Sequence, residues 1–150
     1  MGTCYLGRML TRQPGLTLIE IVTTLSLVGI LTAISLSRAG AFIDRIEVHG
    51  AATEAESMFS RARHIAIARG VPTTIDIDPR RRTLSIRSTN DVLSTRDIGA
   101  AHGVDINANR TSITYSPIGV GYGAANFTMI LSRGRTADTI YVSRLGRVRR

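Results

Sequence analysis

A single carboxylate, Glu20, lies in an apolar segment that is long enough to cross a membrane. The segment runs from Leu16 to Leu36, and Glu20 is its only formal charge. A helix needs about 20 apolar residues to cross the hydrocarbon layer, and an ionised side chain there costs roughly 2.5–3.5 kcal/mol on insertion scales. Such an acid normally has a partner in the assembled state. Cleavage after Gly15 would provide one, because the new α-amino group of Leu16 could pair with Glu20 of a neighbouring subunit.

A second group of residues that can do chemistry is at the C-terminus. Four arginines and no acid occupy residues 144–150, here called the arginine tail: Arg144, Arg147, Arg149 and Arg150. Guanidinium groups hold phosphate oxygens in two-point hydrogen bonds and are weakly hydrated, so this cluster suits a polyanion. The residues alone leave other interpretations open. The tail could be a solvated, disordered end, or it could contact acidic faces of neighbouring subunits or lipid headgroups.

Other candidate sites lack the required residues. His49, His64 and His102 are far apart and have no cysteine or carboxylate at ligand spacing, so no metal site is expected. The glycines of 119–123 are followed by neither a helix signal nor a lysine, which predicts a hairpin connection and no phosphate loop. No serine has an elbow motif or a paired base. We therefore expect neither an enzyme nor a bound cofactor.

Charge and length limit the function further. The chain has 150 residues with 19 basic residues, all arginine, and 11 acids, which gives a net charge of +8. This excess favours anionic partners such as nucleic acid or a phospholipid surface. Arg8 and Arg12 precede the apolar segment, and basic flanks stay in the cytoplasm, so the C-terminal part is expected to be exported. The one cysteine, Cys4, would be lost on cleavage after Gly15.

The chain after the apolar segment is expected to continue as a helix. Apolar residues recur at spacings of three and four from Phe42 to Ala66, which predicts one buried stripe. Gly70 and Pro72 are typical helix terminators. One helix is therefore predicted over 16–69, with a membrane half and an amphipathic half.

Beyond Pro72 the pattern changes to strands. Alternation of polar and apolar residues predicts a hairpin, and later short runs predict further strands, with an irregular strand near 92–98 in a polar loop. The expected strands cover 74–78, 83–87, 112–115, 127–131 and 139–142. One long helix followed by short strands indicates an α+β fold, in which the amphipathic half of the helix covers one face of a small antiparallel sheet.

A second basic cluster, Arg80-Arg81-Arg82, falls in the expected hairpin turn. It could extend a phosphate-binding face if the fold brings it near the arginine tail. Asp76 and Asp78 partly cancel its field, so a solvated turn is the simpler interpretation. No recognition helix is visible and few aromatic residues accompany the arginines, so neither base-specific reading nor stacking on single strands is expected.

The segment Gly15-Leu16-Thr17-Leu18-Ile19-Glu20 resembles the cleavage and methylation signal of type IV pilins and type II secretion pseudopilins. The resemblance implies that a prepilin peptidase cuts after Gly15 and methylates Leu16, and that Glu20 acts in subunit assembly. The family usually has phenylalanine where this chain has Leu16. The implied organisation is a leader at 1–15, a transmembrane helix at 16–36 that forms the filament core, and a periplasmic head at 37–150.

The second half of the chain is similar to the GspH/FimT group of minor pilins and pseudopilins. The similar stretches are 62–70, 113–119 and 140–149. Within the last of these, Gly146-Arg147-Val148-Arg149 matches the GRxR signature of FimT-type minor pilins that bind incoming DNA during transformation. The match implies phosphate contacts by Arg147 and Arg149, helped by Arg144 and Arg150, with Gly146 in a turn.

Together these features predict a minor pilin subunit in the bacterial inner membrane, with its head in the periplasm, that joins other pilin subunits and binds DNA during natural transformation. The alternative is a GspH-like structural pseudopilin of a type II secretion system that does not bind DNA.

Overall fold

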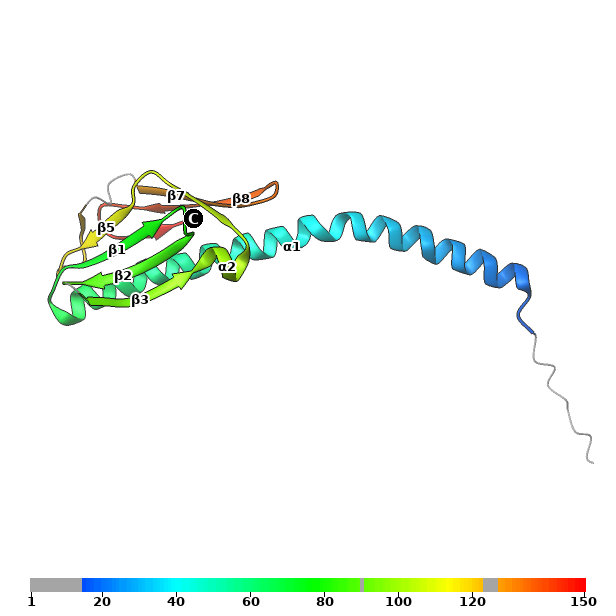
Figure 1. Cartoon of the computed structure of the whole chain (residues 1–150), viewed down its shortest axis with the longest axis horizontal. Helices are drawn as coiled ribbons and strands as arrows, with labels where there is room; N and C mark the ends of the chain where they lie inside the picture. The colour runs from blue at the N-terminus through cyan, green and yellow to red at the C-terminus, as the bar shows by residue number, and fades with distance from the viewer. Residues whose placement is uncertain (1–14, 90, 123–126) are drawn as a thin grey trace, which may run out of the picture. The chain divides into compact units, whose positions relative to one another are not determined.

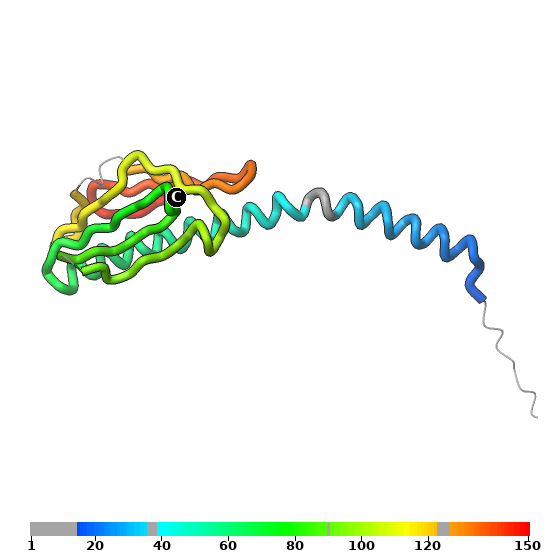
Figure 2. Tube along the Cα trace, viewed as in Figure 1, coloured from blue at the N-terminus to red at the C-terminus, as the bar shows by residue number. Residues whose placement is uncertain are grey.

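A computed structural model describes residues 15–89, 91–122 and 127–150 (Figures 1 and 2). The chain divides into two compact units, Met1–Arg38 and Ala39–Arg150. Helix α1, Leu18–Arg69, belongs to both, so the helix predicted over 16–69 is confirmed to within two residues. The expected leader lies outside the described residues except for Gly15.

The first unit is the apolar part of α1. The helix begins after Thr17, whose hydroxyl accepts a hydrogen bond from the Glu20 N–H at 3.3 Å, as an N-cap does. Its large apolar side chains are exposed, and Glu20 is the only charged residue between Leu18 and Leu36. Several side-chain hydroxyls of this part donate hydrogen bonds to backbone carbonyls three or four residues earlier, so that they need no water. They belong to Thr23, Thr24, Ser26, Thr32 and Ser35. This part of α1 is therefore long and apolar enough to cross a membrane.

In the second unit, α1 supplies one wall of the core. The buried residues recur at spacings of one, three and four: Val48, Ala51, Ala52, Ala55, Met58, Phe59, Ala62 and Ala66. Phe42, Ile43 and Ile46 were expected in the same stripe, and this part of the prediction is wrong. They are exposed because the buried apolar face of α1 begins at Val48, although Arg133 of β7 still reaches Asp44 at 3.0 Å.

Within the described residues, nine strands form two antiparallel sheets. The five-stranded sheet has the order β3-β2-β1-β5-β6, and the four-stranded sheet has the order β4-β7-β8-β9. The first comprises β1 Thr73–Asp78, β2 Thr83–Ser88, β3 Asp91–Asp97, β5 Ser112–Tyr115 and β6 Gly121–Tyr122. The second comprises β4 Asp105–Ala108, β7 Phe127–Arg133, β8 Thr136–Val142 and β9 Val148–Arg149. The short helix α2, Ile98–His102, connects β3 to β4, a path that Figure 2 shows.

The inner faces of both sheets and of α1 form one hydrophobic core. The rings of Phe59 on α1 and Phe127 on β7 lie 5.6 Å apart between centroids. Along β1 and β2 buried and half-exposed residues alternate, as expected for strands with one face in the core. On the outer face, Asp76 and Arg87 form an ion pair at 2.8 Å. Every fully buried apolar side chain of the described residues belongs to 48–142, so the head contains its own core.

The structure adds elements that the sequence interpretation missed. A single sheet was expected, and two are present. The strand expected near 92–98 is confirmed as β3, whereas the helix α2 and the strand β4 that follow it were not expected. Asp97 caps α2 by accepting the Ala100 N–H at 2.7 Å, and Gly103 ends it in the left-handed conformation. The tail, for which a disordered end was one alternative, contains strand β9.

Candidate functional site

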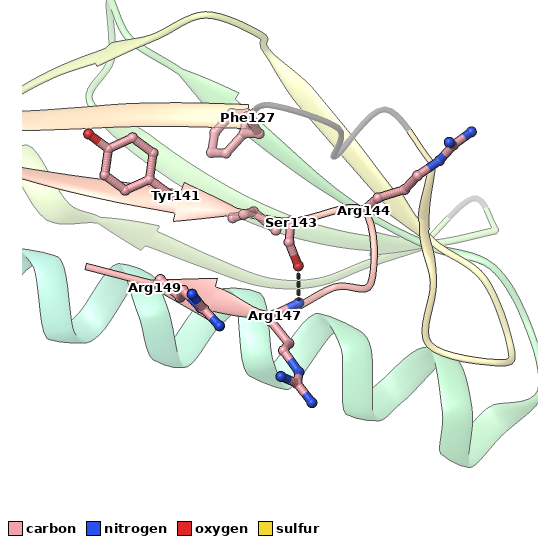
Figure 3. A pocket seen from close by; sticks show the side chains of 7 residues that line it. Phe127, Tyr141, Ser143, Arg144, Arg147 and Arg149 are labelled. Carbon is pink, nitrogen blue, oxygen red and sulfur yellow. Dashed lines mark hydrogen bonds between the residues drawn. The ribbon is translucent and has the colours of Figure 1, made fainter.

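The arginine tail is folded as the second half of a hairpin. β9 pairs with β8 in antiparallel register, with Tyr141 opposite Arg149 and Val142 opposite Val148. The turn between the strands closes by a hydrogen bond from the Ser143 N–H to the Arg147 carbonyl at 2.9 Å. The Ser143 Oγ accepts the Arg147 N–H at 3.2 Å, the bond drawn in Figure 3. The arginines are thus displayed from an ordered backbone.

Gly146 occupies the tightest position of this turn. Its φ is +73°, a conformation that residues with a Cβ rarely adopt. A Cβ at this position would lie 2.7 Å from the Gly119 carbonyl oxygen and 3.1 Å from a ring carbon of Tyr115. Both backbone conformation and space therefore require glycine, and the expected position of Gly146 in a turn is observed.

Three arginines of the tail are exposed and have no ion-pair partner among the described residues. Arg144, Arg147 and Arg149 are exposed, and the ion pairs found among the described residues include none of them. Two hollows adjoin these side chains. The Tyr141 hollow, of about 430 Å³, is lined by Phe127, Tyr141, Val142, Ser143, Arg144, Arg147 and Arg149 (Figure 3). The helix-side hollow, of about 300 Å³, is lined by Glu56, Ser60, Arg63, His64 and the tail residues Gly146, Arg147, Val148 and Arg149.

Arg150 is used differently from the other tail arginines. Its guanidinium lies 3.3 Å from the Asp138 carboxylate and 2.8 Å from the Thr53 hydroxyl, and it also contacts the His49 ring at 3.0 Å. These contacts connect the end of the chain to β8 and α1. Arg144, Arg147 and Arg149 have no such ion pair among the described residues.

The second basic cluster does not adjoin the tail. Tyr115 pairs with Thr73 at the start of β1, and its ring is the one that crowds Gly146. The turn with Arg80–Arg82 follows the other end of β1, roughly 16 Å away along the strand. The cluster is also partly neutralised: Arg81 lies 3.9 Å from Asp78, and Arg82 lies 3.6 Å from Asp105.

Burial at the base of the tail affects one ionisable group. Tyr115 is buried, and its hydroxyl has no hydrogen-bond partner among the described residues. Burial raises the pKa of Tyr115 to about 12, and the nearby charge of Arg63 opposes this shift. Arg63 itself donates from Nε to the Gly119 carbonyl at 3.0 Å. The phenol therefore stays neutral near neutral pH and acts as an apolar support for the turn.

The histidines differ from the sequence interpretation in one respect. His102 lies between two carboxylates of α1, with Nδ1 2.9 Å from Glu47 and Nε2 3.2 Å from Glu54. The sequence did not show this pairing because the partners are 55 and 48 residues away. No group of three or more metal-ligating side chains is found within the described ranges.

The N-terminal candidate residues lie at the start of α1. Gly15 and Leu16 precede the helix and are exposed, and Glu20 is in its first turn. A carboxylate in the first turn is favoured by the positive end of the helix dipole. Cleavage, methylation and assembly at these residues remain predictions.

A functional candidate that the sequence interpretation missed is Tyr141. It is 53% exposed and lies directly opposite Arg149. Residues opposite each other in a sheet project from the same face. Alternation of side chains along β8 and β9 could have shown that Tyr141 and Arg149 share one face. This signal can be used only when the pairing of the tail with β8 is already known.

The fold is shared with a type IV minor pilin and with a type II secretion minor pseudopilin. The minor pilin FimU of Pseudomonas aeruginosa matches with a TM-score of 0.61 and 21% sequence identity, over 72% of this chain and 90% of that one. The minor pseudopilin EpsH of Vibrio cholerae matches with a TM-score of 0.54 and 13% identity, over 69% of this chain and 94% of that one. No family model matches the sequence, and no curated protein is similar to it. The pilin-like α+β fold expected from the sequence is confirmed.

Proposed function

We propose that the chain is a FimT-like minor pilin that binds DNA through Arg144, Arg147 and Arg149 during natural transformation. The observation that carries this proposal is the set of three exposed guanidinium groups, held by one ordered hairpin without carboxylate partners among the described residues. Guanidinium groups bind phosphate oxygens at two points. The net charge of +8 adds a long-range attraction for a polyanion.

The N-terminal part would place this site on a filament. A prepilin peptidase would cleave after Gly15 and methylate Leu16, and α1 would hold the subunit in the inner membrane with the head in the periplasm. In the assembled filament, the amine of Leu16 would pair with Glu20 of another subunit. The apolar, exposed first half of α1 supports this role, since its side chains have no core of their own to enter.

DNA binding can be tested with the head alone, because residues 39–150 contain the whole core. We expect the head to bind duplex DNA with an affinity that falls with salt at a log–log slope of about −3 if three phosphates are contacted. The double variant Arg147→Gln, Arg149→Gln should weaken binding and reduce the slope to about −1.

The matched control is Arg80→Gln, Arg81→Gln, which removes the same charge at the far end of β1. A general effect of net charge would give both double variants the same loss, and that result would contradict a site at the tail. Absence of binding at low salt would also contradict the proposal. The measurement is repeated with several heads linked together, because a single head could bind DNA too weakly to detect.

Mass spectrometry of the chain from cells with active processing tests the N-terminal part. We expect a mature chain that begins at Leu16 and carries one additional methyl group. A chain that retains residues 1–15 would contradict this part.

A structural pseudopilin is the second candidate. Ile67, Ile118 and Leu145 expose apolar side chains at the end of α1 and in the two turns beside it. A Cβ at Gly119 would lie 2.9 Å from the Ile67 side chain, which shows how close the first two of these segments are. Exposed apolar side chains suit contacts with other subunits. This role predicts loss of co-assembly on substitution of Ile118 or Leu145 by Ser, without any DNA binding by the wild-type head.

A further inference from the structure

The Tyr141 hollow combines an aromatic ring with cations and has no carboxylate in its lining. Its described lining consists of apolar, hydroxyl and guanidinium side chains. The helix-side hollow, by contrast, includes Glu56. A negatively charged ligand that also has an aromatic part is therefore better suited to the Tyr141 hollow. Its volume of about 430 Å³ is within the range of sites for small organic groups.

Tyr141 has no evident structural role in the head. Its neighbours on β8, Ile140 and Val142, enter the core, whereas Tyr141 projects from the outer face. It is 53% exposed. The buried Tyr115 shows the opposite case, in which the ring fills the core. An exposed ring of this size is available to a ligand.

The position of Tyr141 relative to Arg149 suits a nucleotide. Directly opposite residues have Cβ atoms about 4.5–5.5 Å apart and share one face of the sheet. A phosphate held by Arg149 or Arg147 would thus leave its base within reach of the Tyr141 ring. Every base has a π-face that stacks on an aromatic side chain, and stacking is combined with cationic grooves in proteins that bind single strands.

We infer that the Tyr141 hollow binds an unpaired nucleobase, so that the DNA recognised by this head is single-stranded, or has an unpaired end, in preference to a continuous duplex. This inference depends on the DNA binding proposed above and specifies its substrate. In a duplex, the π-faces of the bases are covered by their stacked neighbours. A duplex would therefore contact only the arginines and gain nothing from Tyr141.

The test compares the head with its Tyr141→Leu variant on a single-stranded oligothymidylate and on a duplex of the same length, by fluorescence anisotropy at one salt concentration. We expect Tyr141→Leu to weaken single-strand binding about 5- to 10-fold and to change duplex binding less than about 2-fold. Tyr141→Phe should retain single-strand binding, because stacking needs the ring and not the hydroxyl. Tyr122→Leu is the matched control, since Tyr122 is also exposed but lies in the other sheet.

A strand that carries abasic sites separates stacking from phosphate binding. Wild type and Tyr141→Leu should bind it equally, and both more weakly than wild type binds the intact strand. Equal losses on single strand and duplex, or no loss on either, would overturn the inference and leave the arginine site intact. If the wild-type head binds neither form of DNA, the inference fails together with the proposed function.

Discussion

The Arg150 guanidinium lies 3.3 Å from the Asp138 carboxylate, with only 26% and 24% of the two side chains exposed. Asp138 belongs to β8, and the same guanidinium reaches Thr53 on α1. The last residue of the chain therefore connects the tail hairpin to the helix. These contacts give Arg150 a structural role that Arg144, Arg147 and Arg149 do not share.

This difference predicts separable effects of two substitutions. Arg150→Gln should lower the free energy of unfolding by about 1 kcal/mol, because a half-buried ion pair and a hydrogen bond to Thr53 are lost. Its effect on DNA affinity should be small. Arg147→Gln should do the reverse, with unchanged stability and weaker binding. Urea unfolding and anisotropy on the same samples measure both; equal binding losses would show that Arg150 also contacts phosphate.

Gly146→Ala should destabilise the head by about 2 kcal/mol or more. The variant would have an unfavourable positive φ and a Cβ 2.7 Å from the Gly119 carbonyl oxygen. Gly70→Ala is the control, because Gly70 also has a positive φ, +65°, but has open space around it. It should cost only about 1 kcal/mol. Thermal unfolding compares the two, and equal costs would mean that the contact with Gly119 contributes nothing.

The buried phenol of Tyr115 predicts a loss of stability in alkali. Its pKa is raised to about 12 from 10.0, so the folded state holds the proton more tightly than the unfolded chain. The associated stabilisation is complete below pH 10 and is lost as the pH rises toward 12, by an amount on the order of 2–3 kcal/mol. The chain has no lysine, so few other groups titrate in this window.

Unfolding in urea at pH 9, 10.5 and 11.5 measures this loss. Tyr115→Phe should remove the dependence, and it should not destabilise the head at pH 8, because the hydroxyl has no partner to lose. A variant that retains the same alkaline loss would show that the Tyr115 phenol is not its source.

Local periodicity was sufficient to predict much of the fold. The helix end at Arg69 follows from Gly70 and Pro72, and the β1–β2 hairpin follows from strict alternation on both sides of a turn. The division into two sheets could not be predicted in this way. It is set by pairings between distant strands, such as β1 with β5 and β4 with β7, which leave no local signal in either partner.

The candidate site shows the same limit. The sequence shows that arginines cluster in the tail, but the separate role of each arginine depends on its neighbours in the folded structure. Asp138 is 12 residues before Arg150 in the sequence, and its contact follows only from the β8–β9 hairpin. Likewise, the sequence shows few aromatic residues near the arginines, and only the register of β8 and β9 places Tyr141 opposite Arg149.

Glu20→Gln tests the assembly role proposed for the membrane half of α1. The variant should still insert in the membrane, because loss of a charge makes insertion into hydrocarbon less costly. It should fail to enter filaments, because an amide cannot form an ion pair with the amine of Leu16. The control is Glu56→Gln, which removes the same charge from α1 in the head. Immunoblots of sheared filaments and of membranes measure both pools. Normal amounts of Glu20→Gln in the filament fraction would exclude pairing between Glu20 and the new N-terminus as a requirement for assembly.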